Sequence, residues 1–139
     1  MGGLHVIVDT SVWIEFLRPG PSKAGDHLES LIRQQERLVV PETVLMELLS
    51  GTADEVAADR RLRMLESFEV TPTEPVVDSL AAARLQRACR REGESVRNLG
   101  DCLIASVSLR LDVPVLHRDR DFEVLRRHCG IQTVSLLEL

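Results

Sequence analysis

The sequence predicts an α/β fold, a single compact domain in which a central parallel β-sheet is flanked by helices. Three observations indicate this class. The chain has 139 residues, about the size of one domain. Short apolar runs alternate along it with segments of helical periodicity, which is the order expected of strand–helix–strand units. The apolar runs lack strict polar–apolar alternation, so we expect helices to cover their sheet on both faces.

The strands are predicted from short, largely β-branched apolar runs, and the helices from apolar residues at helical spacing between start and stop signals. Pro41 and Pro75 suit a first helical turn. Pro19, Gly51 and Gly130 mark helix ends. In chain order the expected elements are strand 4–8, helix 12–17, helix 23–36, strand 37–40, helix 41–51, helix 53–67, strand 68–70, helix 75–93, helix 101–109, strand 113–116, helix 118–130 and strand 131–134. No internal repeat or linker interrupts this order, so residues 1–139 are expected to form one domain.

Acidic residues recur where a parallel sheet is expected to place its functional site. In open parallel sheets that place lies beyond the carboxyl ends of the strands. Asp9 ends the first strand, and Asp119 and Asp121 follow the fourth. Glu47 lies about two turns into the helix after the second strand, and Asp101 opens the helix that leads to the fourth. The sequence does not determine where Asp101 lies relative to the sheet edge.

Each acidic residue has an alternative interpretation. The aspartates could cap their helices or complement the helix dipole. Glu47 fits this alternative less well because it borders the apolar face of its helix, where a carboxylate is costly unless it is paired or bound to a metal. Several converging carboxylates would be stabilised by a divalent cation. Mg²⁺ held by carboxylates and substrate phosphate is the centre that phosphodiester hydrolysis uses.

Composition and missing motifs exclude other classes. The three cysteines form no CxxC pair and the histidines have no HExxH spacing, which argues against a zinc site. No Walker loop, GxGxxG or GxSxG motif occurs. Aromatic residues make up 3% of the chain, too few for a base-stacking platform. No apolar stretch could span a membrane and the N-terminus does not resemble a signal peptide, so we expect a cytoplasmic protein without a membrane partner.

Four segments together resemble the PIN-domain family, and their close spacing in a small chain resembles the VapC toxins of VapBC toxin–antitoxin pairs. Each motif is weak alone, but four in the right order are specific, and they run over essentially the whole chain. The segments are VDTSVWIE (8–15), PETVLMELLSG (41–51), DCLIA (101–105) and HRDRDF (117–122).

The resemblance implies an endoribonuclease that depends on magnesium or manganese. Matching the motifs residue by residue assigns the metal-site positions to Asp9, Glu47, Asp101 and Asp119, with Asp121 as a fifth contributor. It also implies a homodimer and neutralisation by a cognate VapB-type antitoxin that inserts into or across the active-site groove.

Other polar residues beside these motifs receive supporting roles. Thr10 or Ser11 would orient the first acid or a water molecule. His117 departs from the family, where many relatives carry Thr or Ser, and is expected behind the metal ligands. Arg97, Arg118 and Arg120 flank the acidic motifs and are candidate RNA phosphate contacts, with solvated surface arginines as the alternative. The acidic motifs therefore have both polar and basic neighbours.

Other functions fit the residues less well. A phosphoacceptor receiver domain needs a lysine near the sheet edge, and Lys23, the only lysine, is far from any late strand. A haloacid-dehalogenase-type phosphatase needs a second Asp two residues after the first, where Ser11 stands. A non-catalytic PIN-like module that binds RNA or protein is the stronger rival, although none of the expected acids is missing.

Overall fold

A computed structural model describes residues 3–139, which form five strands in one parallel sheet and seven helices. The predicted fold class is therefore confirmed. The strands are β1 (His5–Val8), β2 (Arg37–Pro41), β3 (Glu69–Thr71), β4 (Val115–His117) and β5 (Thr133–Ser135). The helices are α1 (Thr10–Leu17), α2 (Lys23–Arg33), α3 (Glu42–Ser50), α4 (Glu55–Leu65), α5 (Val77–Arg91), α6 (Leu99–Leu111) and α7 (Arg120–Cys129).

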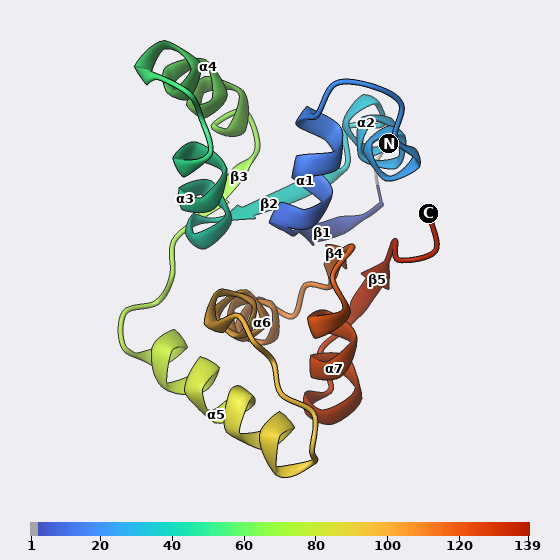
Figure 1. Ribbon diagram of the computed structural model, residues 1–139. Helices are drawn as coiled ribbons and strands as arrows, with labels where there is room; N and C mark the ends of the chain where they lie inside the picture. The colour runs from blue at the N-terminus through green and yellow to red at the C-terminus, as the bar shows by residue number, and fades with distance from the viewer. Residues whose placement is uncertain (1–2) are drawn as a thin grey trace.

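The strand order β3-β2-β1-β4-β5 places a topological switch point between β1 and β4. The chain moves outward from β1 to β3, then crosses back over the sheet to β4 and β5. Helices α1, α2 and α4 lie on one side of the sheet and α5, α6 and α7 on the other (Figure 1). Helix α3 begins directly at the end of β2 and contacts both α1 and α6. The carboxyl ends of β1 and β4 thus meet where the two layers of helices diverge.

The central strands are buried on both faces, as their uninterrupted apolar runs predict. Val6, Ile7 and Val8 of β1 and Val115 of β4 have no exposed surface. Trp13 of α1 is equally buried and meets Phe16 and Phe68 edge to face. Because β1 is the central strand and pairs with both β2 and β4, the residue that follows it lies at the middle of the sheet edge.

Several helix boundaries differ from the sequence prediction for identifiable reasons. Helix α6 begins at Leu99, because the side chain of Asn98 accepts a hydrogen bond from the backbone N–H of Gly100 and caps the helix. Gln35 (φ 56°) and Val76 (φ 65°) adopt left-handed backbone conformations. These conformations shorten the predicted helices 23–36 and 75–93, because a left-handed residue cannot continue a right-handed helix. None of the described helices is long and apolar enough to cross a membrane.

Candidate metal centre

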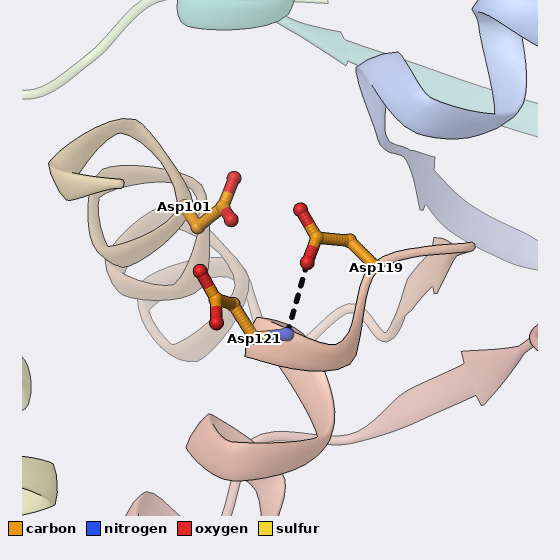
Figure 2. Close-up of side chains that lie close together, drawn as sticks. All are labelled: Asp101, Asp119 and Asp121. Carbon is orange, nitrogen blue, oxygen red and sulfur yellow. Dashed lines mark hydrogen bonds between the residues drawn. The ribbon is translucent and has the colours of Figure 1, made fainter. Parts of the chain in front are cut away.

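Three aspartates from two helices converge at the switch point. One carboxylate oxygen from each of Asp101, Asp119 and Asp121 lies within 4.8 Å of the others. Asp101 projects from the first turn of α6, whereas Asp119 and Asp121 come from the start of α7 (Figure 2). These residues are about twenty positions apart in sequence, and the crossing of α6 and α7 brings them together.

Asp9 and Asp119 both cap helices, so this alternative interpretation is correct for them. Asp9 caps α1 and accepts hydrogen bonds at Oδ2 from both the backbone N–H (3.0 Å) and the hydroxyl of Ser11. Asp119 caps α7 by accepting the Asp121 N–H at Oδ1 (2.9 Å). Each cap uses one carboxylate oxygen, which leaves the second oxygen of each residue available for another ligand.

Asp101 does not cap α6, since Asn98 occupies that position, and the capping interpretation is wrong for this residue. Its side chain is 4% exposed. Within residues 3–139, Oδ2 of Asp101 is buried without a hydrogen-bond partner. A buried carboxylate oxygen without a partner is costly in a folded protein. This unpartnered oxygen is therefore the feature of the cluster that points most directly to a bound cation.

The electrostatics of the cluster favour added positive charge. Burial, followed by the charges of Asp9 and Asp119, a hydrogen bond with Asp119 and the charge of Asp121, raises the pKa of Asp101 to about 9. The pKa of Asp9 is also raised by burial, against the hydrogen bonds from Ser11, with smaller contributions from the charges of Asp119 and Glu47. The acids therefore repel one another, and a cation among them would reverse these shifts.

Thr10 and Ser11 connect the acids to their neighbours. Thr10 Oγ1 donates to Oε1 of the half-buried Glu47 (3.1 Å), which ties α1 to α3. The Ser11 hydroxyl donates to Asp9 and accepts the backbone N–H of Arg118 (2.9 Å). Ser11 thus joins the turn after β1 to the turn after β4. The structure brings Asp101, Asp119 and Asp121 into direct proximity. Asp9 and Glu47 are not part of this group of three, but the charge of Asp9 helps to raise the pKa of Asp101, and that of Glu47 helps to raise the pKa of Asp9.

The residues present fit a hard divalent cation. All the candidate ligands are carboxylates, whose oxygens Mg²⁺ and Mn²⁺ prefer, whereas zinc favours nitrogen and sulfur. Cys102 is buried beside Asp101 in sequence, but burial raises the pKa of its thiol to about 12, which disfavours the thiolate that a metal needs. The unpartnered Oδ2 of Asp101 supplies the further oxygen that an ion would use.

The three arginines predicted near the site differ in their surroundings. Arg97 and Arg120 line one hollow together with Asp119 and Asp121. The backbone N–H of Arg97 also donates to Oδ2 of Asp121 (3.3 Å). The guanidinium of Arg118 instead donates to the backbone oxygen of Leu139 (3.0 Å). The structure thus places two of the three arginines at the acidic cluster and directs the third to the end of the chain.

Sequence reasoning missed Glu123 and left the contacts of His117 open. His117 is fully buried and its Nε2 lies 2.9 Å from Oε2 of Glu123 in α7. In the sequence Glu123 resembles an ordinary first-turn acid that complements the helix dipole. Its pairing with a histidine six residues earlier depends on how α7 packs over β4, which no local pattern reveals.

A doubly wound parallel sheet that gathers carboxylates at its switch point defines a small α/β protein with an acidic cluster of the kind that metal-dependent nucleases use. The PIN domain family matches residues 6–127. The ribonuclease VapC11 of Mycobacterium tuberculosis is 34% identical over 131 residues, which span 94% of this chain and 98% of that protein. The chain therefore belongs to the PIN-domain family, and within that family it is a VapC-type protein.

Solved structures agree with this assignment at the level of the fold. FitAcB from Neisseria gonorrhoeae has a TM-score of 0.73 at 19% identity, covering 96% of this chain and 99% of its own. VapBC2 from Rickettsia felis, bound to a DNA fragment from its promoter, has a TM-score of 0.72 at 17% identity, with 95% and 98% covered. VapBC-5 from Mycobacterium tuberculosis has a TM-score of 0.63 at 25% identity, again with 95% and 98% covered.

Proposed function

We propose that this chain is a divalent-metal-dependent endoribonuclease and the toxin of a type II toxin–antitoxin pair. The observation that carries the proposal is the convergence of Asp101, Asp119 and Asp121 around a buried carboxylate oxygen without a partner in the described chain. The name of the VapC11 relative, a ribonuclease aligned over nearly its whole length, supports RNA as the substrate.

Asp9, Glu47, Asp101 and Asp119 would hold Mg²⁺ or Mn²⁺, with Asp121 as a further contributor. When bound, such an ion would acidify a water molecule and neutralise charge on the scissile phosphate. The chain's own residues fix the geometry. Ser11 holds Asp9 Oδ2 and Thr10 holds Glu47 Oε1, so that each carboxylate keeps one oxygen for the ion.

Arg97 and Arg120 would hold the RNA backbone next to this centre. Both line the hollow that contains Asp119 and Asp121, so a phosphate there would meet both acidic and basic groups. Guanidinium groups bind phosphate oxygens through paired hydrogen bonds. Without a cation the cluster would repel RNA, and we therefore expect substrate affinity to depend on both the bound ion and these two arginines.

We further propose a VapB-type antitoxin and a second copy of this chain as partners. Structural neighbours named as VapBC assemblies support the antitoxin. The homodimer rests on family resemblance. A cytoplasmic location would follow from the RNA substrate. That residues 1–139 form one domain also stays a prediction.

The proposal is tested by incubating RNA with the purified chain in Mg²⁺, in Mn²⁺ or in EDTA, alongside Asp9→Asn. Asn is as good a helix cap as Asp, so this variant keeps the fold while losing a charged ligand. Asp54→Asn is the matched control, because Asp54 caps α4 in the same way but lies outside the acidic cluster.

We expect EDTA-sensitive cleavage by the unmodified chain and by Asp54→Asn, and none by Asp9→Asn. Equal cleavage by Asp9→Asn would remove Asp9 from the site. If no RNA is cut and Mn²⁺ does not bind in a calorimetric titration, the chain is instead a non-catalytic binding module and the proposal fails.

A further inference from the structure

His117 is not one of the proposed metal ligands, but it is fully buried and lies close to them in sequence. It ends β4, two residues before Asp119, and none of its surface is exposed. Its ring packs against Phe122, with 5.2 Å between the ring centroids. A buried imidazole needs hydrogen-bond partners for both ring nitrogens.

The hydrogen bonds of His117 define one tautomer. Nδ1 lies 3.1 Å from the backbone nitrogen of Asp119. A backbone N–H can only donate, so Nδ1 must accept and carries no proton. The ring proton is then on Nε2, which donates to Oε2 of Glu123 at 2.9 Å. The ring is therefore a rigid connector between the Asp119 backbone and the Glu123 carboxylate.

The Glu123 end of this connector is anchored by two further side chains. Thr133 of β5 donates its hydroxyl to the same oxygen, Oε2, at 2.9 Å. Arg126 of α7 donates to the other oxygen, Oε1, at 2.9 Å. The Glu123 carboxylate thus connects α7 to β4 and β5 through hydrogen bonds. Since both of its oxygens are engaged, Glu123 holds the imidazole in a single orientation.

The other end controls the turn that carries the acids. In this turn the N–H of Arg118 donates to Ser11, that of Asp119 to His117, and that of Asp121 to Oδ1 of Asp119. The bond from the Asp119 N–H to His117 has the form of an Asx-turn, in which a side chain accepts the backbone N–H two residues later. It determines how the Asp119 backbone leaves the sheet, and with it the direction of its carboxylate.

We propose that His117 is a positioning residue for the metal centre. Its Nδ1 fixes the Asp119 backbone while Nε2 is held by Glu123, and this arrangement directs Asp119 and Asp121 toward Asp101. The inference rests on the proposed function, since it assumes that these aspartates bind a divalent cation. It adds a specific role for His117, Glu123 and Thr133.

Two substitutions of His117 each remove one of its two hydrogen bonds and keep the other. In His117→Asn the side-chain oxygen takes the place of Nδ1 and still accepts the Asp119 N–H, but contact with Glu123 is lost. In His117→Gln the amide nitrogen takes the place of Nε2 and still donates to Glu123, but the acceptor for Asp119 is lost. His128→Asn is the control, because His128 also pairs with a glutamate, Glu94, but at the far end of α7.

The readouts are Mn²⁺ affinity by calorimetry and the unfolding temperature in EDTA. We expect His117→Gln to lower Mn²⁺ affinity about tenfold or more, while His117→Asn keeps most of it and His128→Asn all of it. Between the two His117 variants, stability should follow the opposite order, because Asn is smaller than Gln and leaves a cavity in the core. A merely structural role would make both quantities fall together, with His117→Asn the worse, and that outcome would overturn the inference.

The tautomer is tested without any substitution. A long-range ¹H–¹⁵N NMR spectrum of the unmodified chain should show His117 protonated at Nε2 and not at Nδ1, and the opposite pattern would refute the role of Nδ1 as an acceptor. If the unmodified chain binds no Mn²⁺, the proposed function itself fails. If it binds Mn²⁺ and both variants bind equally well, only the positioning role fails.

Discussion

Replacing Asp101 by Asn should stabilise the metal-free protein, although it removes a candidate metal ligand. The side chain is buried, and Oδ2 has no hydrogen-bond partner in residues 3–139. Oxygens of Asp119 and Asp121 lie within 4.8 Å. In the absence of a cation, an ionised Asp101 is therefore opposed by both desolvation and repulsion. Asn has nearly the same shape but carries no charge, and its amide hydrogens face carboxylate oxygens.

The magnitude follows from the ionisation of Asp101. Its pKa rises from 3.8 to about 9 on folding, so at pH 7 the metal-free folded chain keeps this carboxyl protonated while the unfolded chain ionises it. Three pKa units separate pH 7 from the unfolded value, which corresponds to roughly 4 kcal/mol against folding. Asn avoids this cost. We expect Asp101→Asn to raise the free energy of unfolding by about 2 to 4 kcal/mol, because local relaxation recovers part of the penalty.

The pH dependence carries the same sign. A carboxyl with a raised pKa binds its proton more tightly in the folded state, so its stabilising contribution is present below pH 3.8 and is lost as pH rises toward about 9. The assay is urea unfolding in EDTA across this interval. The unmodified chain should lose stability with increasing pH more steeply than Asp101→Asn, by about one proton. Added Mn²⁺ should then stabilise the unmodified chain far more than the variant.

Two results would refute this reasoning. One is a metal-free Asp101→Asn protein that is less stable than the unmodified chain at pH 7, which would mean that the carboxylate is stabilised by its surroundings. The other is an identical pH slope for both proteins, which would mean that Asp101 ionises normally in the folded state. Either outcome would also remove the physical argument that Oδ2 of Asp101 binds a cation.

Two further predictions concern RNA binding and the ion pair between Asp78 of α5 and Arg110 of α6. Replacing Arg97 and Arg120 together by Ala should weaken RNA binding and reduce its salt dependence by about two counterions. Arg118→Ala, whose guanidinium contacts the end of the chain, should leave the salt slope unchanged, and equal slopes in all three proteins would contradict the assignment. Burial raises the pKa of Asp78, but the hydrogen bonds from Arg110, at 2.8 and 3.1 Å, outweigh it and lower the pKa. Asp78→Asn should lower the free energy of unfolding by about 1 to 2 kcal/mol at pH 7, because Arg110 is partly exposed and Asn keeps an acceptor oxygen. This deficit should shrink below pH 3.8, where protonation of Asp78 weakens the native pair. A deficit that is constant with pH would contradict this prediction.

The sequence was sufficient for the order of the strands along the chain and for a parallel sheet, because the central strands are short runs that are apolar on both faces. Val6 to Val8 and Val115 to Leu116 are buried throughout, and only a sheet covered by helices on both sides accommodates such runs. The boundaries were less accurate where a single backbone conformation decides them. Gln35 and Val76 adopt left-handed conformations that neither residue type favours, and these end or delay helices. The residue types therefore did not predict these boundaries.

The acids that follow the ends of strands could be placed at one edge of the sheet from topology, but the hydrogen-bond partners of the candidate site could not. The pairs Thr10–Glu47 and His117–Glu123 join residues on different elements. Such contacts depend on the angle at which helices pack over the sheet, which periodicity does not encode. The same limit explains why Arg118 resembled Arg120 in the sequence and separates from it in the structure.

The competition between capping and ligation, which the sequence left open, is resolved differently at each acid. A cap needs one carboxylate oxygen, and Asp9 and Asp119 each use one in this way, which fixes the side chain and leaves the second oxygen oriented by the first. Asp101 has no such anchor, because Asn98 caps its helix. Its side chain is instead buried next to the carboxylates of Asp119 and Asp121. The two capping acids are thus positioned by hydrogen bonds that hold with or without a cation, whereas Asp101 is held at an electrostatic cost that a cation would relieve. On this argument Asp101 should be the acid whose removal most reduces the stabilisation gained from Mn²⁺, and the capping acids should contribute more to the geometry of the site.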